Sequence, residues 1–153
     1  MRTEARPARP RRTRSRAHHP PDPSKHSGAG FPPAVTRRGQ KTHGRWFAPG
    51  AAPSAVTSGQ DALSQRVNDV LQAAGCPKLP VTASADVELK IAAAMRDQGI
   101  TDATVVINNQ PCKGMMSCDG LLGVVLPPGS TLTVHGTDGF TKIYKGGEKP
   151  WWS

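Results

Sequence analysis

Four side chains in the second half of the 153-residue sequence are of types that bind metals and transfer protons. Asp86 and Glu88 lie two residues apart where a helix is expected to start. Cys112 follows a proline after an expected strand, and Cys118 lies at the expected start of the next helix. Carboxylates and thiolates are zinc ligands, and a helix N-terminus favours their charged forms. Because a catalytic zinc needs three protein ligands and an open position for water, Asp86, Cys112 and Cys118 would supply the required number.

Each of these residues also has a purely structural interpretation. Acidic side chains in a first helical turn stabilise the helix through its dipole, so Asp86 and Glu88 need no further role. Cys112 and Cys118 could be buried thiols of the core, as we expect for Cys76 at a helix end. The metal interpretation therefore depends on the four residues occurring together, in this order and with suitable flanking sequence.

The elements that must position these residues follow from hydrophobic spacing and from residues that begin or end helices. Helices are predicted from Ser58 or Asp61 to Gly75, from about Ser84 to Gly99 and around 118–125, and strands at 104–107, 131–135 and 142–144. One hairpin is predicted within residues 31–59, packing on the domain through Trp46 and Phe47. Helices and strands in this order predict a small α/β domain.

The positive charge of the chain is confined to its first third. The net charge is +9, yet residues 1–45 contain twelve basic and two acidic residues, while the remainder contains eight basic and nine acidic residues. A basic DNA-binding fold would carry its charge on the hydrophobically patterned part, so that class of protein is disfavoured. Residues 1–30 hold five prolines and few aliphatic side chains, which predicts a disordered tail or linker before a domain at 31–153.

We expect neither a signal peptide nor a transmembrane segment in this chain. No apolar run approaches the roughly 18 residues that a membrane-spanning helix requires. The arginine-rich start also lacks the apolar stretch of a secretory signal.

The order of the four metal-binding and proton-transferring candidates is similar to the zinc-deaminase signature, H-x-E followed by P-C-x-x-C. Asp86 occupies the histidine position, and five residues separate Cys112 from Cys118. Flanking segments extend the similarity at residues 39–46, 95–100, 107–112 and 145–152. From about residue 31 to residue 153, the sequence resembles the SCP-like bacterial toxin deaminases, a group in the cytidine deaminase-like superfamily that includes a deaminase of double-stranded DNA.

This resemblance implies a fold and a mechanism. The fold would be a three-layer α/β/α cytidine deaminase-like sandwich with a central mixed sheet. Zn²⁺ would be bound by Asp86, Cys112 and Cys118, and Glu88 would transfer protons while cytosine in DNA is converted to uracil. The chain would thus be a zinc-dependent hydrolase.

The resemblance also implies partners and a setting. Asn108 or Asn109, at the end of the strand before the first cysteine of the motif, would hydrogen-bond the nucleotide of the DNA substrate. The protein would be the C-terminal effector of a secreted bacterial toxin, acting in the cytoplasm of a target cell, with a cognate immunity protein as its partner.

Two alternatives stay open from the sequence. The substrate could instead be single-stranded DNA, RNA or a free nucleoside, because pocket shape decides this choice. The protein could also be an impaired deaminase-like domain that binds nucleic acid. Asp86 in place of histidine gives the zinc three anionic ligands, which would raise the pKa of bound water and lower activity.

Overall fold

The computed structural model of the protein describes residues 31–37, 39–111, 114 and 116–153. The predicted tail at 1–30 lies outside the described residues, as do residues 38, 112, 113 and 115. In chain order the elements are β1 (His43–Phe47), β2 (Ser54–Thr57), α1 (Ala62–Ala73), the 3₁₀ turn η2 (Thr82–Ala85), α2 (Val87–Gln98), β3 (Asp102–Ile107), α3 (Cys118–Val125), β4 (Thr131–His135) and β5 (Thr141–Lys145). None of the helices in the described part is long and apolar enough to cross a membrane.

The strands form one mixed sheet in the order β2-β1-β3-β4-β5. β3 and β4 are parallel, and the other neighbouring pairs are antiparallel. The chain passes from β3 to β4 through α3, because parallel neighbours need a crossover connection. The carboxyl ends of β3 and β4 therefore lie at the same edge of the sheet.

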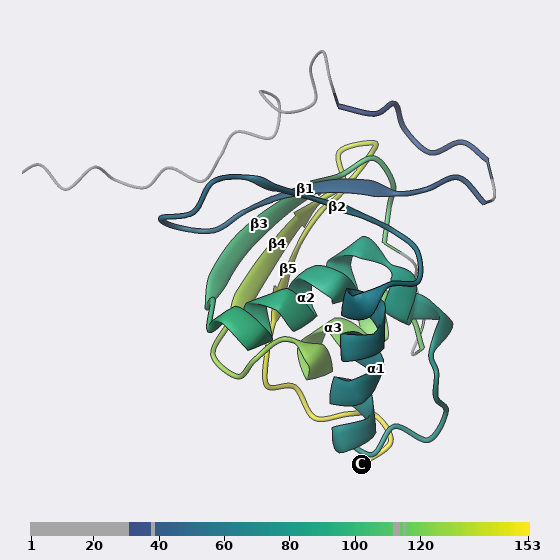
Figure 1. Ribbon diagram of the computed structural model, residues 1–153, viewed down its shortest axis with the longest axis vertical. Helices are drawn as coiled ribbons and strands as arrows, with labels where there is room; N and C mark the ends of the chain where they lie inside the picture. Colours follow the sequence, from purple (N-terminus) through teal and green to yellow (C-terminus); the bar gives the residue numbers. More distant parts are fainter. Residues whose placement is uncertain (1–30, 38, 112–113, 115) are drawn as a thin grey trace, which may run out of the picture.

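The α-helices α1, α2 and α3 pack together on one face of the sheet (Figure 1). Alternate strand residues face these helices and share a core with them: Ala103, Val105, Ile107, Leu132 and Val134. The predicted α/β fold with a central mixed sheet is thus confirmed. In the described residues the three helices lie on one face of this sheet, where they bury apolar side chains against one another and against the sheet.

Local sequence signals set the helix boundaries. Asp61 begins α1 through a capping box, in which Asp61 Oδ1 accepts from Ser64 N at 3.0 Å and Ser64 Oγ accepts from Asp61 N at 2.7 Å. α2 ends at Gly99, whose φ of 68° is left-handed. The prediction that α2 starts near Ser84 is wrong, because Thr82–Ala85 form a 3₁₀ turn and the helix begins at Val87.

The predicted hairpin is confirmed as the antiparallel pair β1 and β2. Trp46 is buried in the core, as expected. Phe47 is the next residue of the strand and therefore faces the opposite side of the sheet. Of the two aromatic residues expected to pack on the domain, Trp46 thus lies in the core that the sheet shares with the helices.

Arg96 joins the two helices that carry the predicted site. Its Nε donates to the carbonyl oxygen of Val125 at 3.0 Å, and its Nη2 donates to those of Val124 and Leu126, both at 3.3 Å. These carbonyls belong to the end of α3, where no further helical N–H is available to them. A single guanidinium on α2 thus satisfies the carboxyl end of α3 and fixes the two helices relative to each other.

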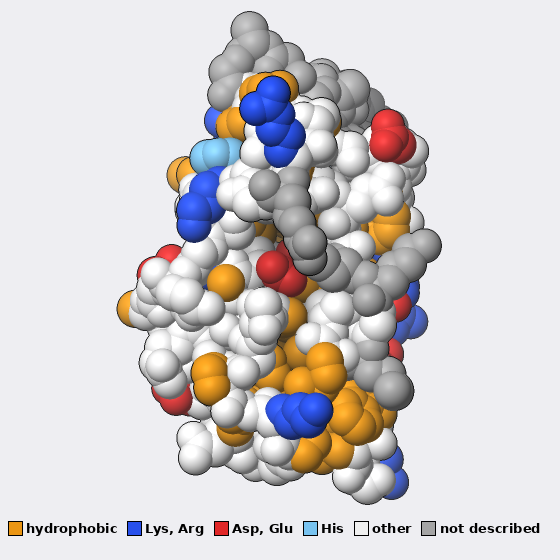
Figure 2. All heavy atoms as spheres, turned by 90° about the vertical axis from the view of Figure 1, so that its right-hand side faces the viewer, with side chains coloured by type: hydrophobic (Ala, Val, Ile, Leu, Met, Phe, Trp, Pro, Cys, Tyr) orange, Lys and Arg blue, Asp and Glu red, His pale blue; other side chains and the backbone are white. Residues whose placement is uncertain are grey.

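The C-terminus packs against the end of α1. Trp152 Nε1 donates to the carbonyl oxygen of Ala74 at 2.9 Å. The rings of Trp151 and Trp152 pack edge to face, with their centroids 5.4 Å apart. Hydrophobic side chains gather at the lower end of the face shown in Figure 2, toward the C-terminus. Trp152 therefore fastens the end of the chain to α1.

Gly44 lets the beginning of α2 approach β1 closely, which yields the first prediction. A Cβ at Gly44 would lie 2.5 Å from Val87 Cγ1 and 3.3 Å from Val105 Cγ2. Gly44→Ala should therefore lower the free energy of unfolding by about 1–3 kcal/mol through overpacking. Urea unfolding of Gly44→Ala, Val87→Ala and the double variant checks this, because removing the valine methyl groups should relieve the clash. Two single-variant losses that simply add would contradict this packing constraint.

Candidate active site

Three of the four residues predicted to do chemistry converge where two helices begin. Asp86 is the N-cap of α2, and Glu88 lies in its first turn. Cys118 is the first residue of α3. The Sγ of Cys118 lies 3.1 Å from Asp86 Oδ2 and 3.5 Å from Glu88 Oε2. The fold thus brings together a thiol and two carboxylates that are remote in the sequence.

Asp86 does not cap the helix that it begins. Aspartate at an N-cap usually accepts a hydrogen bond from a backbone N–H of the first turn. Asp86 has the extended backbone typical of this position, but its side chain accepts no such bond and instead accepts one from the Cys118 thiol. The side chain of Asp86 therefore contacts the thiol of α3 and not the backbone of the helix that it begins.

Burial dominates the electrostatics of the three groups. Only 3 % of Glu88 and 1 % of Cys118 are exposed. Burial raises the pKa of Glu88 to about 7, and the nearby Asp86 carboxylate adds to this shift. Burial also raises the pKa of the Cys118 thiol, with further increases from Glu88 and Asp86. Among these protein groups alone, desolvation and the neighbouring carboxylates outweigh the thiolate stabilisation expected from the helix N-terminus.

The first turn of α3 is tied to β5. Asp119, which follows Cys118, accepts hydrogen bonds at its Oδ1 from Lys142 Nζ at 2.6 Å and from Tyr144 Oη at 3.1 Å. Tyr144 is buried, and burial followed by the Asp119 contact raises its pKa. This pairing fixes the residue beside Cys118 to the sheet and so limits the movement of the thiol.

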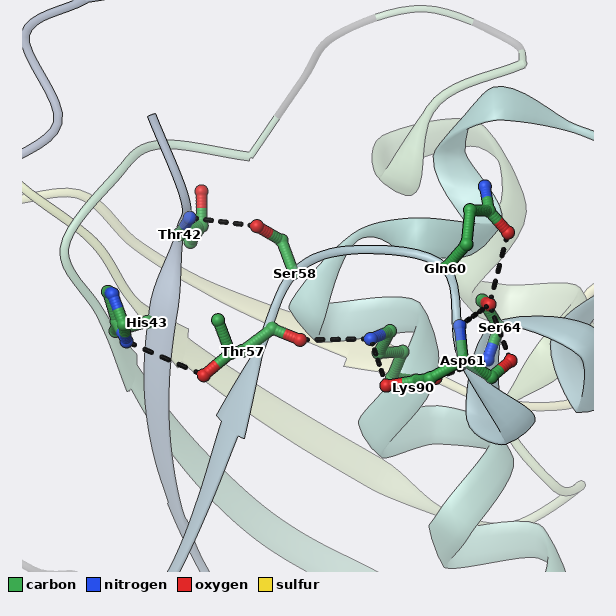
Figure 3. Close-up of polar contacts among 8 residues, drawn as sticks. All are labelled: Thr42, His43, Thr57, Ser58, Gln60, Asp61, Ser64 and Lys90. Carbon is green, nitrogen blue, oxygen red and sulfur yellow. Dashed lines mark hydrogen bonds and ion pairs between the residues drawn. The ribbon is translucent and has the colours of Figure 1, made fainter. Parts of the chain in front are cut away.

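A fully buried lysine, Lys90, connects α2 to β2 and to the start of α1 (Figure 3). Lys90 has no exposed surface, and its Nζ donates to the Thr57 carbonyl oxygen at 2.9 Å and to Asp61 Oδ2 at 2.6 Å. Asp61 is in turn the N-cap of α1. The ammonium group lowers the pKa of Asp61. The Lys90 ammonium therefore connects the helix that carries Glu88 to β2 through a hydrogen bond and to the start of α1 through an ion pair.

A small pocket opens beside the two carboxylates. It has a volume of about 20 Å³ and is lined by Thr42, Asp86, Val87, Glu88, Asn109, Gln110 and Pro111. A cavity of this size holds about one water molecule. The Asn109 side chain donates from Nδ2 to Thr42 Oγ1 at 3.0 Å across one wall, and Gln110 Nε2 donates to the Thr137 carbonyl oxygen at 3.3 Å.

The two asparagines after β3 have different surroundings. Asn109 lines the pocket beside Asp86 and Glu88. Asn108 does not line it and is 4 % exposed. Its Oδ1 accepts from His43 N at 2.7 Å, and its Nδ2 donates to the Pro33 carbonyl oxygen at 2.9 Å. With its side chain engaged by backbone groups, Asn108 is a poor candidate for contact with a nucleotide.

The predicted metal ligand Cys112 lies outside the described residues. Within the described part, no group of three or more histidine, cysteine, aspartate or glutamate side chains is arranged to hold a metal. The described part supplies two of the three predicted ligands, Asp86 and Cys118, in contact with each other. Cys76 is buried at the end of α1, where its thiol donates to the Lys78 carbonyl oxygen at 3.5 Å, in agreement with a structural role.

Thr42, Gln110 and Lys90 are features of the site that sequence reasoning did not assign. Thr42 and Gln110 lie within the segments that resemble the deaminase group, so this resemblance was the available signal for them. Lys90 had no such signal, because a lysine within a strongly helical run is normally expected at the surface.

A hollow of about 310 Å³ lies elsewhere, between α1, the end of α2 and α3. Its charged lining groups already have partners. Arg66 pairs with Asp97, and Arg96 donates to the end of α3. This hollow offers no group comparable with the buried carboxylates of the small pocket.

A comparison with protein families agrees with the fold and with the convergence of these residues. The chain belongs to the SCP1.201-like deaminase family, whose sequence model matches residues 15–150. The predicted resemblance is therefore confirmed. A comparison with curated proteins gives no match. Because deamination replaces an amino group with oxygen from water, membership of this family implies a hydrolase.

The pairing of Lys90 with Asp61 yields the second prediction. Asp61→Ser should keep an N-cap acceptor but leave the Lys90 ammonium buried without its counter-ion, at a cost of about 3 kcal/mol in the free energy of unfolding. Lys90→Met should cost less, because Asp61 is half exposed and can hydrate. Urea unfolding of both variants and of Asp61→Ser/Lys90→Met measures this asymmetry, and the double variant should recover most of the loss. An equal or greater loss in Lys90→Met would show that Lys90 does not depend on Asp61.

Proposed function

We propose that the protein is a zinc-dependent deaminase that converts cytosine to uracil in DNA. The observation that carries this proposal is the convergence of Asp86, Glu88 and Cys118 at one buried point in a member of the SCP1.201-like deaminase family. The order of these residues follows the zinc-deaminase signature, with the proton-transferring glutamate two positions after the first ligand.

The donor set suits zinc. Asp86 and Cys118 offer an oxygen and a sulfur ligand that already touch, and Cys112 would provide the third ligand. A divalent cation would also compensate the negative charge that burial makes unfavourable at this point. When bound, the metal supplies Lewis-acid activation of a water molecule.

Glu88 is the group that moves protons. Its carboxylate borders the pocket that has room for about one water. Glu88 takes a proton from this water as the oxygen attacks C4 of cytosine, and it delivers the proton to N3 of the ring. The second proton of the water passes through Glu88 to the leaving amino group. The bond between C4 and nitrogen then breaks, ammonia leaves and uracil remains.

Asn109 and Thr42 form the wall through which the base would enter. Their hydrogen bond closes one side of the pocket, and a pyrimidine is several times larger than the water that fits there. Breaking this bond frees the Asn109 amide to hydrogen-bond the nucleotide in its place. We therefore assign the predicted nucleotide contact to Asn109 and not to Asn108.

DNA is the proposed substrate because the family resemblance favours it, while the positive charge of residues 1–45 would strengthen binding to any nucleic acid. The same resemblance supports a role as the effector part of a secreted bacterial toxin, in which uracil formation damages the DNA of a target cell. A cognate immunity protein that blocks the effector would then be its natural protein partner.

Loss of the proton-transferring carboxylate is the third prediction. Glu88→Gln should lower the rate of uracil formation by about 10²- to 10⁴-fold, because it removes general acid and base catalysis. Its zinc content should equal that of the parent protein, because Glu88 is not a proposed ligand. The measurement is uracil release from single- and double-stranded DNA, with RNA and cytidine as further substrates. Asp102→Asn, at the exposed opposite end of β3, is a matched control and should retain full activity.

The outcomes of this assay separate the candidate functions. Uracil formation that persists in Glu88→Gln would exclude the mechanism. Activity on RNA or cytidine but not on DNA would show that the substrate is RNA or a free nucleoside and not DNA. An inactive parent protein that binds nucleic acid would support the impaired domain, and Asp86→His should then restore turnover because it makes the site less negative.

A further inference from the structure

Ser84 carries a buried hydroxyl group that has no hydrogen-bond partner in the described part of the chain. The residue is 0 % exposed, and its Oγ is the only buried side-chain nitrogen or oxygen of the described residues that lacks a partner. Burying a hydroxyl without a hydrogen bond destabilises a protein, because the group loses its bonds to water. Such groups are rare in native proteins and occur where strain, chemistry or a bound ion accounts for them.

The usual local partners of a serine do not account for this hydroxyl. Serine often caps a helix or binds a backbone carbonyl one turn earlier. The N-cap of α2 is Asp86, and the N-cap of the 3₁₀ turn η2 is Val81. Ser84 N donates to the Val81 carbonyl oxygen at 3.1 Å, but Ser84 Oγ makes no such contact. The hydroxyl therefore stabilises neither η2 nor the start of α2.

Asp86, two residues further along the chain, has an acceptor atom without a donor. Its Oδ2 accepts from the Cys118 thiol at 3.1 Å, while its Oδ1 accepts no hydrogen bond from the described residues. Residues two apart in a 3₁₀ turn are separated by about 4 Å along its axis, a distance that two short side chains can bridge. An unused donor and an unused acceptor therefore lie close together, beside the proposed metal ligands.

The turn that carries Ser84 and Asp86 is held in place by its own backbone and by α1. Asp86 N donates to the Ala83 carbonyl oxygen at 2.9 Å. Asn68 of α1 accepts at its Oδ1 from Val81 N at 3.0 Å. With the backbone fixed at both ends of the turn, a hydrogen bond between Ser84 and Asp86 depends on the rotamers of the two side chains.

A hydrogen bond from Ser84 suits a carboxylate that binds a metal. Carboxylates that bind metals are usually hydrogen-bonded themselves, which fixes their orientation. In this site a donor also offsets negative charge, because Asp86 stands where the zinc-deaminase signature has a neutral histidine. A hydroxyl that donates to Asp86 therefore compensates in part for a third anionic ligand.

We propose that Ser84 is a positioning residue whose hydroxyl donates a hydrogen bond to the Asp86 carboxylate when Asp86 binds the metal ion. This inference rests on the proposed function for the presence of the metal. It gives a role to a buried donor that the secondary structure does not use, and it explains how a carboxylate is oriented at a position where the signature has histidine.

The test compares zinc affinity and stability in two serine variants of the full chain. Ser84→Ala removes the unpaired hydroxyl. Ser130→Ala is the matched control, because Ser130 is also buried but its Oγ donates to the Pro127 carbonyl oxygen at 2.6 Å, at the end of the sheet opposite to the pocket. Competition with a chromophoric chelator measures the zinc affinity. Urea unfolding with zinc and with excess chelator measures the stability.

Ser84→Ala should bind zinc about 10-fold more weakly than the parent protein, as is typical when a partner of a metal ligand is lost. In excess chelator it should unfold at a higher urea concentration than the parent, because it no longer buries an unpaired hydroxyl. The rise in the urea midpoint that zinc causes should be smaller in Ser84→Ala, since this rise follows the affinity. Ser130→Ala should lower the midpoint equally with and without zinc and keep the zinc affinity of the parent.

The proposal is overturned if Ser84→Ala binds zinc as tightly as the parent protein, as expected for a serine that is paired with a buried water. A lower urea midpoint of Ser84→Ala in chelator also overturns it, because the hydroxyl would then have a partner without the metal. A parent protein that binds no zinc would refute both the proposed function and this role of Ser84. A protein that forms no uracil but shows the expected zinc affinities would refute the proposed function alone.

Discussion

The structure depends on one buried convergence, in which the thiol of Cys118 meets the carboxylates of Asp86 and Glu88. Among protein groups alone, ionising this cluster is electrostatically costly, because burial and the neighbouring acidic groups raise the pKa of Glu88 and of the Cys118 thiol. Such clusters occur where they have a function, since apolar side chains would stabilise a core more. The proposed metal binding and proton transfer would account for a cluster that packing alone does not favour.

Contacts with the surrounding elements hold α2 and α3, the helices that carry these three residues. Arg96 connects α2 to the end of α3, and Asp119 connects the start of α3 to β5. Lys90 connects α2 to β2 and to the cap of α1. The close contact between Gly44 and Val87 fixes the distance between the start of α2 and the sheet. The two helix N-termini are thus held from several directions, which limits the displacement of groups that must act at hydrogen-bond distance.

Much of this fold could be predicted from local sequence. The capping residue Asp61, the terminating Gly99 and the β-branched run of β3 each specify local structure strongly, and their elements lie where expected. The predicted start of α2 is three residues early because a 3₁₀ turn, an element that is frequent at helix N-termini, precedes the helix. That the described helices lie on one face of the sheet could not be predicted from the order of the elements alone.

The sequence predicts which residues of the site lie close together only where their order along the chain follows a known motif. Asp86, Glu88 and Cys118 were found through their residue types and spacing. The different roles of Asn108 and Asn109 were not, because a strand end places neighbouring side chains in different surroundings that depend on tertiary contacts. The buried Lys90 was missed for the same reason, since only the fold shows that Asp61 and Thr57 meet it.

The most direct test of the metal centre is a crystal structure of the full chain grown with stoichiometric zinc, with anomalous diffraction recorded at the zinc edge. We expect one strong peak in contact with Asp86, Cys112 and Cys118, and beside Glu88. A zinc peak elsewhere with none at Asp86 and Cys118, or crystals of active protein in which these residues bind no metal, would exclude the proposed metal centre.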